Sequence, residues 1–165
     1  QGKYKIDAGH STTIYNGETV KLSSGYVVGG NGSAADIIGV LNGIFYNDAS
    51  TLKPTFANFY KATITPANSE DTTAFVVDDP FQQYVVSADA ATGVATFLET
   101  YDMNTSAGSD TTGKSSSTLD IGTTSQDGKQ FRMLRSAEDP ENEDATAVRH
   151  SVVVVSNLNS FNGHN

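Results

Sequence analysis

Short runs in which apolar and polar residues alternate recur along this chain, and they predict β-strands. The alternation is clearest in the first part of the chain, at Val20, Leu22, Tyr26 and Val28. Asn16-Gly17 supplies the positive φ angles of a tight turn, and Gly39 and Gly43 interrupt the following apolar run, as happens where a strand bulges or bends. These features indicate a rigid β module, and none of them is typical of a reactive site.

The whole chain is expected to be all-β, with a small β-barrel or β-sandwich architecture of the β-tulip or OB-like kind. Turn residues separate the apolar runs at the spacing typical of sandwiches and barrels. A short helix between 88 and 100 is the alternative in one place, and the unalternating run Val152–Val155 predicts a central strand covered on both faces. The predicted strands are 12–22, 25–29, 37–46, 56–64, 73–77, 81–86, 95–101, 117–121, 130–134 and 148–155.

The domain organisation follows from where polar segments fall. The first ten residues are polar except for Tyr4 and Ile6, which predicts an extended N-terminal arm. The stretch 66–71 is the expected seam between two halves, and 104–117, almost wholly Ser, Thr, Gly and Asp, is expected to be a long surface loop. The predicted segments are therefore an arm at 1–10, an N-terminal β module at 11–65 and a C-terminal barrel or sandwich module at 66–165, with one continuous domain as the alternative.

Composition narrows the range of partners. The formal net charge of −9 argues against nucleic acid, because a phosphate backbone needs a concentrated basic face. Basic residues lie close together only at Lys3 and Lys5 and at Arg132 and Arg135. The chain has no cysteine, which excludes disulfides and thiolate metal sites. No apolar run approaches the length of a membrane span, which is roughly 20 residues.

One segment matches the phosphate-loop pattern. Gly108–Ser115 has a glycine, four residues and then Gly-Lys-Ser. A working phosphate loop follows a buried strand and opens a helix, whose amino end stabilises the phosphates. The residues before this segment are polar, and those after it have no helical period, so we interpret it as part of the surface loop.

Acidic residues offer two further candidates. The cluster Glu138–Asp144 has several carboxylates, which Ca²⁺ prefers as ligands, but it lacks the spacing and the central glycine of an EF-hand. Asp78 and Asp79 resemble the carboxylate pair of a hydrolase, yet Pro80 follows them and favours a turn. We interpret the cluster as a solvated loop and the pair as a turn, and we expect neither a metal nor another cofactor.

Histidines and aromatic residues complete the candidates. His10, His150 and His164 show no sign of converging with catalytic partners, so no enzymatic activity is expected. Most aromatic residues are expected in the core, whereas one or two exposed ones would serve as interface anchors. They form two groups in the sequence, Phe45, Tyr46, Phe56, Phe59 and Tyr60, and then Phe75, Phe81 and Tyr84.

Several short motifs resemble a known family. Gly17–Leu22, Gly25–Val27 and Ile38–Phe45 are similar to the small β modules of tailed-bacteriophage capsid decoration proteins, also called cement proteins. The second half resembles uncharacterised phage structural proteins through Phe75–Phe81, the Thr112–Ser115 loop and Leu119-Asp120.

The resemblance implies a virion protein on the outside of an icosahedral head. Such proteins commonly form trimers at threefold positions and tie neighbouring shell subunits together, which implies the major capsid protein as partner, and a homo-oligomer. The family has no catalytic residues to carry over. We expect the contact with the shell at Lys3, Tyr4, Lys5 and Ile6 of the arm and at the aromatic residues Phe56, Phe59 and Tyr60.

Two alternatives stay open. The first is another virion part, such as a tail, fibre or host-binding β domain, which exposed aromatics with carbohydrate affinity would favour. The second is a calcium-dependent binding domain or a small hydrolase that uses Asp78, Asp79 or the carboxylates of 138–144.

Overall fold

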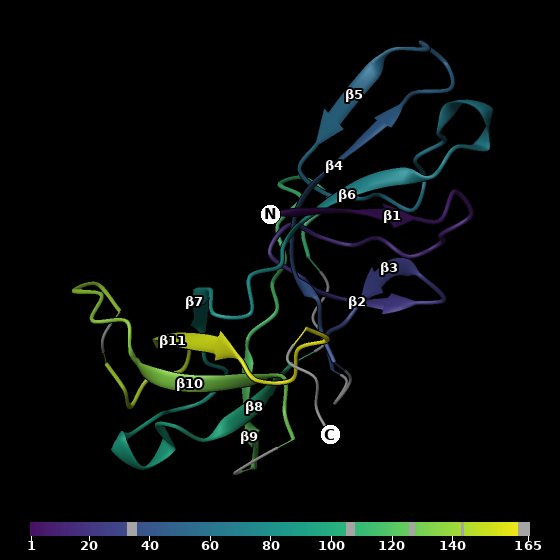
Figure 1. Cartoon of the computed structure of the whole chain (residues 1–165). Coiled ribbons are helices and arrows are strands. Elements are labelled where there is room, and N and C mark those ends of the chain that lie inside the picture. Colours follow the sequence, from purple (N-terminus) through teal and green to yellow (C-terminus); the bar gives the residue numbers. More distant parts are fainter. Residues whose placement is uncertain (33–35, 105–107, 126–127, 143, 162–165) are drawn as a thin grey trace. The chain divides into compact units, whose positions relative to one another are not determined.

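The computed structural model describes residues 1–32, 36–104, 108–125, 128–142 and 144–161 (Figure 1). In this part the chain is almost entirely β-structure, arranged in two antiparallel sheets that do not close into barrels. The all-β prediction is therefore confirmed. The elements are β1 (Gly2–Ile6), β2 (Thr19–Ser23), β3 (Tyr26–Gly29), β4 (Gly39–Asn47), β5 (Pro54–Ala57), η1 (Ala67–Ser69), β6 (Thr72–Val77), β7 (Gln83–Ser87), η2 (Val94–Thr96), β8 (Thr100–Met103), β9 (Leu119–Ser125), β10 (Phe131–Ser136) and β11 (Ser151–Ser156).

The chain divides into two compact units, and each is built from separated segments. Unit 1 consists of Gln1–Gly30, Ile38–Asp79 and Ala107–Ser116, and unit 2 consists of Asn31–Ile37, Pro80–Ser106 and Ser117–Asn165. These bounds differ from the predicted ranges 11–65 and 66–165. The reason is strand pairing: β6 lies between β1 and β4 in one sheet, so the chain after 66 still belongs to the first unit.

Unit 1 contains a six-stranded sheet in the order β1-β6-β4-β2-β3, with β5 paired to the far half of β4 (Figure 1). The sheet curls, so that β1 and β3 also lie near each other. Its concave side is apolar, and burial of each large aliphatic side chain contributes about 1.5–3 kcal/mol. The core residues are Ile6, Ile14, Val20, Val27, Ile38, Leu41, Ile44, Tyr60, Ala74 and Val76.

The first residues do not form a free arm. Gly2–Ile6 are extended, as predicted, but they pair with β6 along their whole length, and Ile6 is fully buried. Lys3 and Lys5 alternate with Tyr4 and Ile6, so one side of the segment is apolar and joins the core. This two-residue period is typical of a half-buried strand, and the pairing with β6 places the strand at the edge of the sheet.

The β2–β3 hairpin turns where the predicted strands 12–22 and 25–29 meet. Ser23 pairs with Tyr26, and Ser24 and Gly25 between them both have positive φ, 51° and 86°. Two positive φ angles are characteristic of a type I′ turn, which matches the twist of the flanking strands. The predicted turn at Asn16-Gly17 also forms, with φ of 82° at Gly17, but it lies before β2 begins.

The predicted bend in the third strand is present in β4. The register with β6 shifts between Leu41 and Gly43, which leaves exposed Asn42 as the extra residue of a bulge. At Gly39, φ is 149°, and a Cβ atom would lie 2.0 Å from the carbonyl oxygen of Val77. Only glycine permits this approach of β4 to β6.

Unit 2 contains a five-stranded sheet in the order β7-β11-β10-β8-β9. β11 lies between β7 and β10, and Val152, Val153 and Val154 are all buried, which confirms the central strand predicted there. In the range 88–100, where a short helix was the alternative, the helical part is only the single turn η2. The core residues are Ile37, Tyr101, Met103, Leu119, Phe131, Met133, Val152 and Val154.

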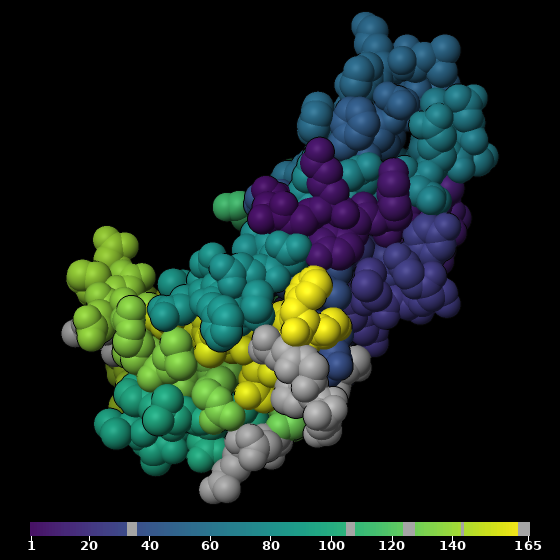
Figure 2. Space-filling view, viewed as in Figure 1, coloured from purple at the N-terminus to yellow at the C-terminus, as the bar shows by residue number. Residues whose placement is uncertain are grey.

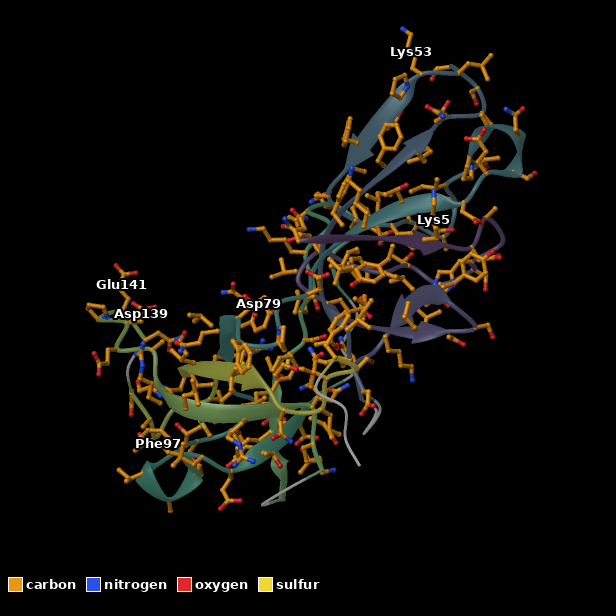
Figure 3. All side chains as sticks on the ribbon, viewed as in Figure 1. Lys5, Lys53, Asp79, Phe97, Asp139 and Glu141 are labelled. Carbon is orange, nitrogen blue, oxygen red and sulfur yellow. The ribbon has the colours of Figure 1, made fainter. Side chains whose placement is uncertain are left out.

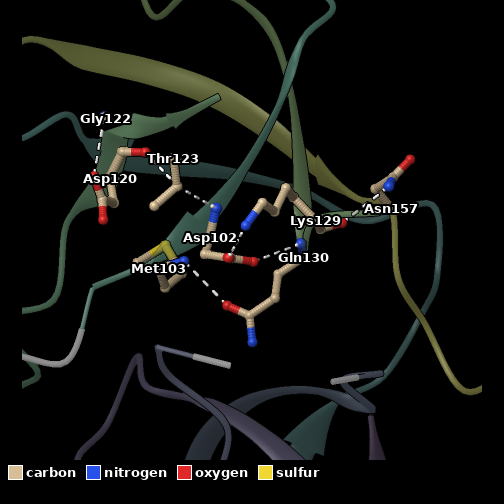
Figure 4. Close-up of polar contacts among 8 residues, drawn as sticks. All are labelled: Asp102, Met103, Asp120, Gly122, Thr123, Lys129, Gln130 and Asn157. Carbon is tan, nitrogen blue, oxygen red and sulfur yellow. Dashed lines mark hydrogen bonds and ion pairs between the residues drawn. The ribbon is translucent and has the colours of Figure 1, made fainter. Parts of the chain in front are cut away.

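A buried polar network supports this sheet next to its core (Figure 4). Lys129 Nζ donates to Asp102 Oδ2 at 2.8 Å, and the backbone N–H of Gln130 donates to Asp102 Oδ1 at 3.3 Å. The Gln130 side chain accepts from the Met103 N–H at 3.0 Å, and Asn157 Nδ2 donates to the Lys129 carbonyl at 2.9 Å. Since a buried charge needs such partners, we interpret Asp102 as a structural residue that ties β8 to the start of β10.

Candidate functional site

β1 presents its two lysines to solvent and its two apolar residues to the core. Lys3 and Lys5 are exposed, whereas Tyr4 is half-buried and Ile6 fully buried. In the space-filling view the N-terminal residues, in purple, lie at the surface (Figure 2). Of the predicted contact residues in this segment, only the two lysines are placed where a partner could reach them.

Three phenylalanine rings lie beside one another on the solvent side of unit 1. Phe56, on β5, is 73% exposed and lies opposite Phe45 of β4, with ring centroids 4.8 Å apart and planes tilted by 47°. The rings of Phe56 and Phe75 are 6.4 Å apart at 17°. An exposed aromatic cluster of this kind is a mark of an interaction surface.

The strand register places the lysines on the same face as these rings. Phe45 lies opposite Thr73 and Thr73 opposite Lys5, while Lys3 lies opposite Phe75. Directly opposite residues of antiparallel strands point to the same side of the sheet. We call the set of Lys3, Lys5, Phe45, Phe56, Thr73 and Phe75 the Phe–Lys face; it crosses β5, β4, β6 and β1, which follow one another in Figure 1.

The Phe–Lys face carries a charge opposite to that of the whole protein. Lys5, labelled in Figure 3, donates from Nζ to the Thr73 hydroxyl at 3.3 Å. Neither Lys3 nor Lys5 is within ion-pair distance of a carboxylate among the described residues. The protein as a whole has a net charge of −9. A local pair of unneutralised cations beside aromatic rings therefore distinguishes this face.

The remaining predicted contact residues lie elsewhere. Tyr60 is only 1% exposed, and its hydroxyl donates to the His10 carbonyl at 2.9 Å, so it is a core residue. Phe59 is half-buried and stacks on Tyr15, with centroids 5.8 Å apart and planes 4° apart. Neither belongs to the Phe–Lys face.

Two members of the face, Phe45 and Phe75, were expected in the core with most aromatic residues. Phe75 follows Ala74 in a strand where Thr72, Ala74 and Val76 are the buried side chains. A two-residue period shows that the two sides of such a strand differ, but it does not show which side is buried. The large ring of Phe75 favours the prediction that its own side is buried, whereas the opposite side is. In β4 the bulge at Asn42 shifts the alternation by one residue. A regular alternation counted from buried Leu41 would place Phe45 on the buried side, whereas it points outward.

Asp78 holds the beginning of β1 through contacts with Tyr4 and the N-terminal amino group. The Tyr4 hydroxyl donates to Asp78 Oδ2 at 2.8 Å. Burial, together with this hydrogen bond and the charge of Asp78, raises the pKa of Tyr4 to about 12. Burial also pushes the pKa of Asp78 upward, but the bond from Tyr4 and backbone N–H groups outweigh it, so this pKa lies below its ordinary value.

Carboxylates of the acidic loop at 138–144 accept hydrogen bonds from backbone N–H groups close by in the sequence. Asp139 Oδ1 accepts from the Glu141 N–H at 3.1 Å, and Asp144 Oδ1 accepts from the Thr146 N–H at 2.9 Å, while residue 143 lies outside the described part. The side chains of Asp139 and Glu141 are exposed (Figure 3). No group of three His, Cys, Asp or Glu residues suited to a metal ion occurs among the described residues.

The phosphate-loop match lies in a different setting from a nucleotide site. Its lysine, Lys114, forms an isolated bridge with Asn16, and Gly113 N–H donates to the Ser109 carbonyl at 2.6 Å. The next element of the described chain is strand β9, where a phosphate loop requires a helix. Gly113 itself has a positive φ of 71°, so the segment is a turn.

That the histidines do not converge with catalytic partners stays a prediction. His10 belongs to unit 1 and His150 to unit 2, and His164 lies outside the described residues. His150 is fully buried, with Nδ1 3.2 Å from the Asn142 carbonyl oxygen.

Within the described residues, no helix is both long enough and apolar enough to cross a membrane. Comparison of this chain with family models, with curated proteins and with solved structures found no match.

Proposed function

We propose that this chain is a structural, non-enzymatic virion protein that decorates the outside of a phage capsid and stabilises it by bridging major capsid subunits. The observation that carries the proposal is the exposed Phe–Lys face. Phe56 alone leaves 73% of its surface in water, and large exposed aromatic side chains are the usual anchors of protein interfaces. The virion context comes from the motif resemblance at Gly17–Leu22 and Ile38–Phe45.

The mechanism is mass action. A protein that binds only the assembled lattice raises the stability of that lattice in proportion to its own binding free energy. A trimer would multiply weak contacts around a threefold position, because the second and third contacts are then intramolecular. The homo-oligomer and the location on the capsid exterior are part of the same proposal.

The pairing of β1 with β6 lowers the entropic cost of forming this contact. A free arm would lose chain entropy when it becomes ordered on the shell. In the Phe–Lys face, Lys3 and Lys5 are already held in a strand paired with β6, so this cost is absent. A preorganised face binds more tightly for the same contacts.

The test is the copy number of the chain in intact particles, measured by quantitative mass spectrometry. Hundreds of copies, in near-integral ratio to the main shell subunit, support a lattice-wide decoration protein. The variant Phe56→Ser should lower this occupancy by at least about tenfold, as expected for an interface anchor. Phe81→Ser is the matched control, because Phe81 is 79% exposed but belongs to unit 2. A handful of copies, or equal loss with both variants, contradicts the proposal.

A second candidate is a tail, fibre or host-binding domain. The exposed ring of Phe56 is the observation that favours it, since a single aromatic face can stack on a sugar. Binding of the chain to a glycan array, abolished by Phe56→Ser, would support this candidate. A rise in melting temperature with Ca²⁺ would instead support a calcium-dependent domain at 138–144.

A further inference from the structure

Strand pairing fixes the length of the Phe–Lys face and the order of apolar and charged side chains along it. Its longest row runs from Phe56 on β5 through Phe45 and Thr73 to Lys5 on β1. Neighbouring strands lie about 4.8 Å apart, so three strand steps place the apolar end and the cationic end about 14 Å from each other. A partner that satisfies both ends must carry complementary groups at that separation.

We infer that the Phe–Lys face binds an extended acidic polypeptide segment that lies across the strands of unit 1. In this arrangement an apolar or aromatic side chain of the segment packs against Phe56 and Phe45. A carboxylate about four residues further along reaches Lys5 and Lys3, because an extended chain advances about 3.3–3.6 Å per residue. The inference deepens the proposed function, on which it rests only for the identity of the partner as a shell protein.

Charge is the first reason for an acidic segment. Lys3 and Lys5 are exposed and have no carboxylate partner among the described residues, in a protein of net charge −9. Complementary charge steers a partner to such a patch and sets its register. A basic or neutral partner would leave both lysines unneutralised at the edge of a closed contact.

The geometry of the phenylalanine rings is the reason to expect a polypeptide partner and not a polysaccharide. The planes of Phe45 and Phe56, the closest pair of rings, are tilted by 47°, so these two rings do not form a flat platform on which a sugar ring stacks. Phenylalanine also lacks a polar group that could bond to a hydroxyl, and aromatic pairs prefer tilted or offset contacts with another ring. An apolar side chain that packs against the solvent side of the two rings needs no such platform.

The experiment measures binding of the full chain to three polyanions by biolayer interferometry. The probes are a random copolymer of glutamate and tyrosine, polyglutamate, and dextran sulfate. The copolymer should bind at least about tenfold more tightly than polyglutamate, because only it supplies an aromatic anchor. Both Phe56→Ser and the pair Lys3→Glu/Lys5→Glu should weaken copolymer binding by at least about tenfold.

A matched control separates the face from net charge. The pair Lys114→Glu/Arg149→Glu makes the same change in net charge at two exposed positions outside the face. It should leave copolymer binding within about twofold, because exposed charges away from the contact are screened. Circular dichroism and the melting temperature of each variant establish that it is folded.

Several outcomes would overturn the inference. Equal binding of polyglutamate and copolymer would mean that charge alone acts, and equal or tighter binding of dextran sulfate would favour a polysaccharide. Absence of copolymer binding, or equal loss with the control pair, would also contradict it. Self-association of the wild type that is lost in Lys3→Glu/Lys5→Glu would assign the face to a second copy. None of these outcomes alters the copy number in particles, so the two proposals fail separately.

Discussion

Each unit has a row of cross-strand neighbours that runs from an exposed apolar residue to an exposed cation, but the middle of the row is buried in unit 2 and half-exposed in unit 1. In unit 2, Val85 of β7 lies opposite Val153 of β11, and Val153 lies opposite Arg135 of β10. This row also runs from an exposed apolar residue, 69% exposed at Val85, to an exposed cation. In its middle, however, Val153 is only 5% exposed, whereas the middle ring of unit 1, Phe45, is half-exposed.

The charge around the two rows differs as well. Unit 1 has six Lys and Arg against eight Asp and Glu, and unit 2 has four against eleven. An acidic partner would therefore meet stronger repulsion at unit 2. The alternation of polar and apolar residues within strands therefore commonly places a cation near apolar residues. Burial of the middle of the row and the surrounding charge decide whether it is a docking face.

The largest expected difference concerns two phenylalanines. Phe131 is 2% exposed and packs edge-on against Tyr84, with ring centroids 6.0 Å apart. Phe131→Ala should lower the free energy of unfolding by roughly 3–5 kcal/mol, because it removes contacts and leaves a cavity. Phe56→Ala should change it by no more than about 0.5 kcal/mol. Urea denaturation measures both, and similar losses would mean that Phe56 is a core residue.

The next effect concerns two glycines of unit 1. At Gly39, where φ is 149°, the Cβ atom of an alanine would lie 2.0 Å from the Val77 carbonyl oxygen. We therefore expect Gly39→Ala to cost roughly 3 kcal/mol or more. Gly17 has φ of 82° with open space around it, so Gly17→Ala should cost only about 1 kcal/mol. Thermal unfolding monitored by circular dichroism compares them, and a harmless Gly39→Ala would contradict the close approach of β4 and β6.

We expect a smaller difference in the free energy of unfolding when one lysine of each unit is replaced. Lys129→Met leaves Asp102, whose side chain is 11% exposed, without its ion-pair partner. This loss should cost roughly 1–3 kcal/mol. Lys5→Met removes only an exposed bond to Thr73, and a substitution at such a surface position should change the free energy of unfolding by no more than about 0.5 kcal/mol. Chemical denaturation of the two variants gives the difference, and equal costs would show that Lys5 is structural and weaken the case for a docking role.

The smallest effect is a pH dependence of stability that arises from Tyr4, which lies between Lys3 and Lys5 in β1. The pKa of Tyr4 is raised to about 12 in the folded protein from an ordinary value of 10.0. A raised acid pKa stabilises the fold below the unfolded value, and this contribution is lost as the pH rises from about 10 towards about 12. Tyr4→Phe removes the titration, so its melting temperature should fall less steeply than that of the wild type across this window. Parallel curves would contradict the raised pKa of Tyr4.

Part of the candidate site was predictable from the sequence. Lys3, Lys5 and Phe56 were expected as contact residues, and all three are exposed on one face of unit 1. Tyr4, Ile6 and Tyr60 were expected with them, but the first is half-buried and the other two are core residues. The alternation of residues 3–6 already contained this division, and treating the segment as an arm obscured it. That any of these residues contacts a shell protein stays a prediction.

The sequence by itself determined the all-β class, the central position of the 152–155 strand and the local alternation that gives each strand a polar and an apolar side. These are consequences of the two-residue period of a strand, which needs only neighbouring residues. Tertiary structure alone decided that β6 lies between β1 and β4 and that β5 pairs with β4, and thereby which rings and lysines share a face. Many pairings satisfy the same alternation, and the entropy of closing a loop changes only slowly with its length. Local pattern therefore could not select among them, and packing of the core did.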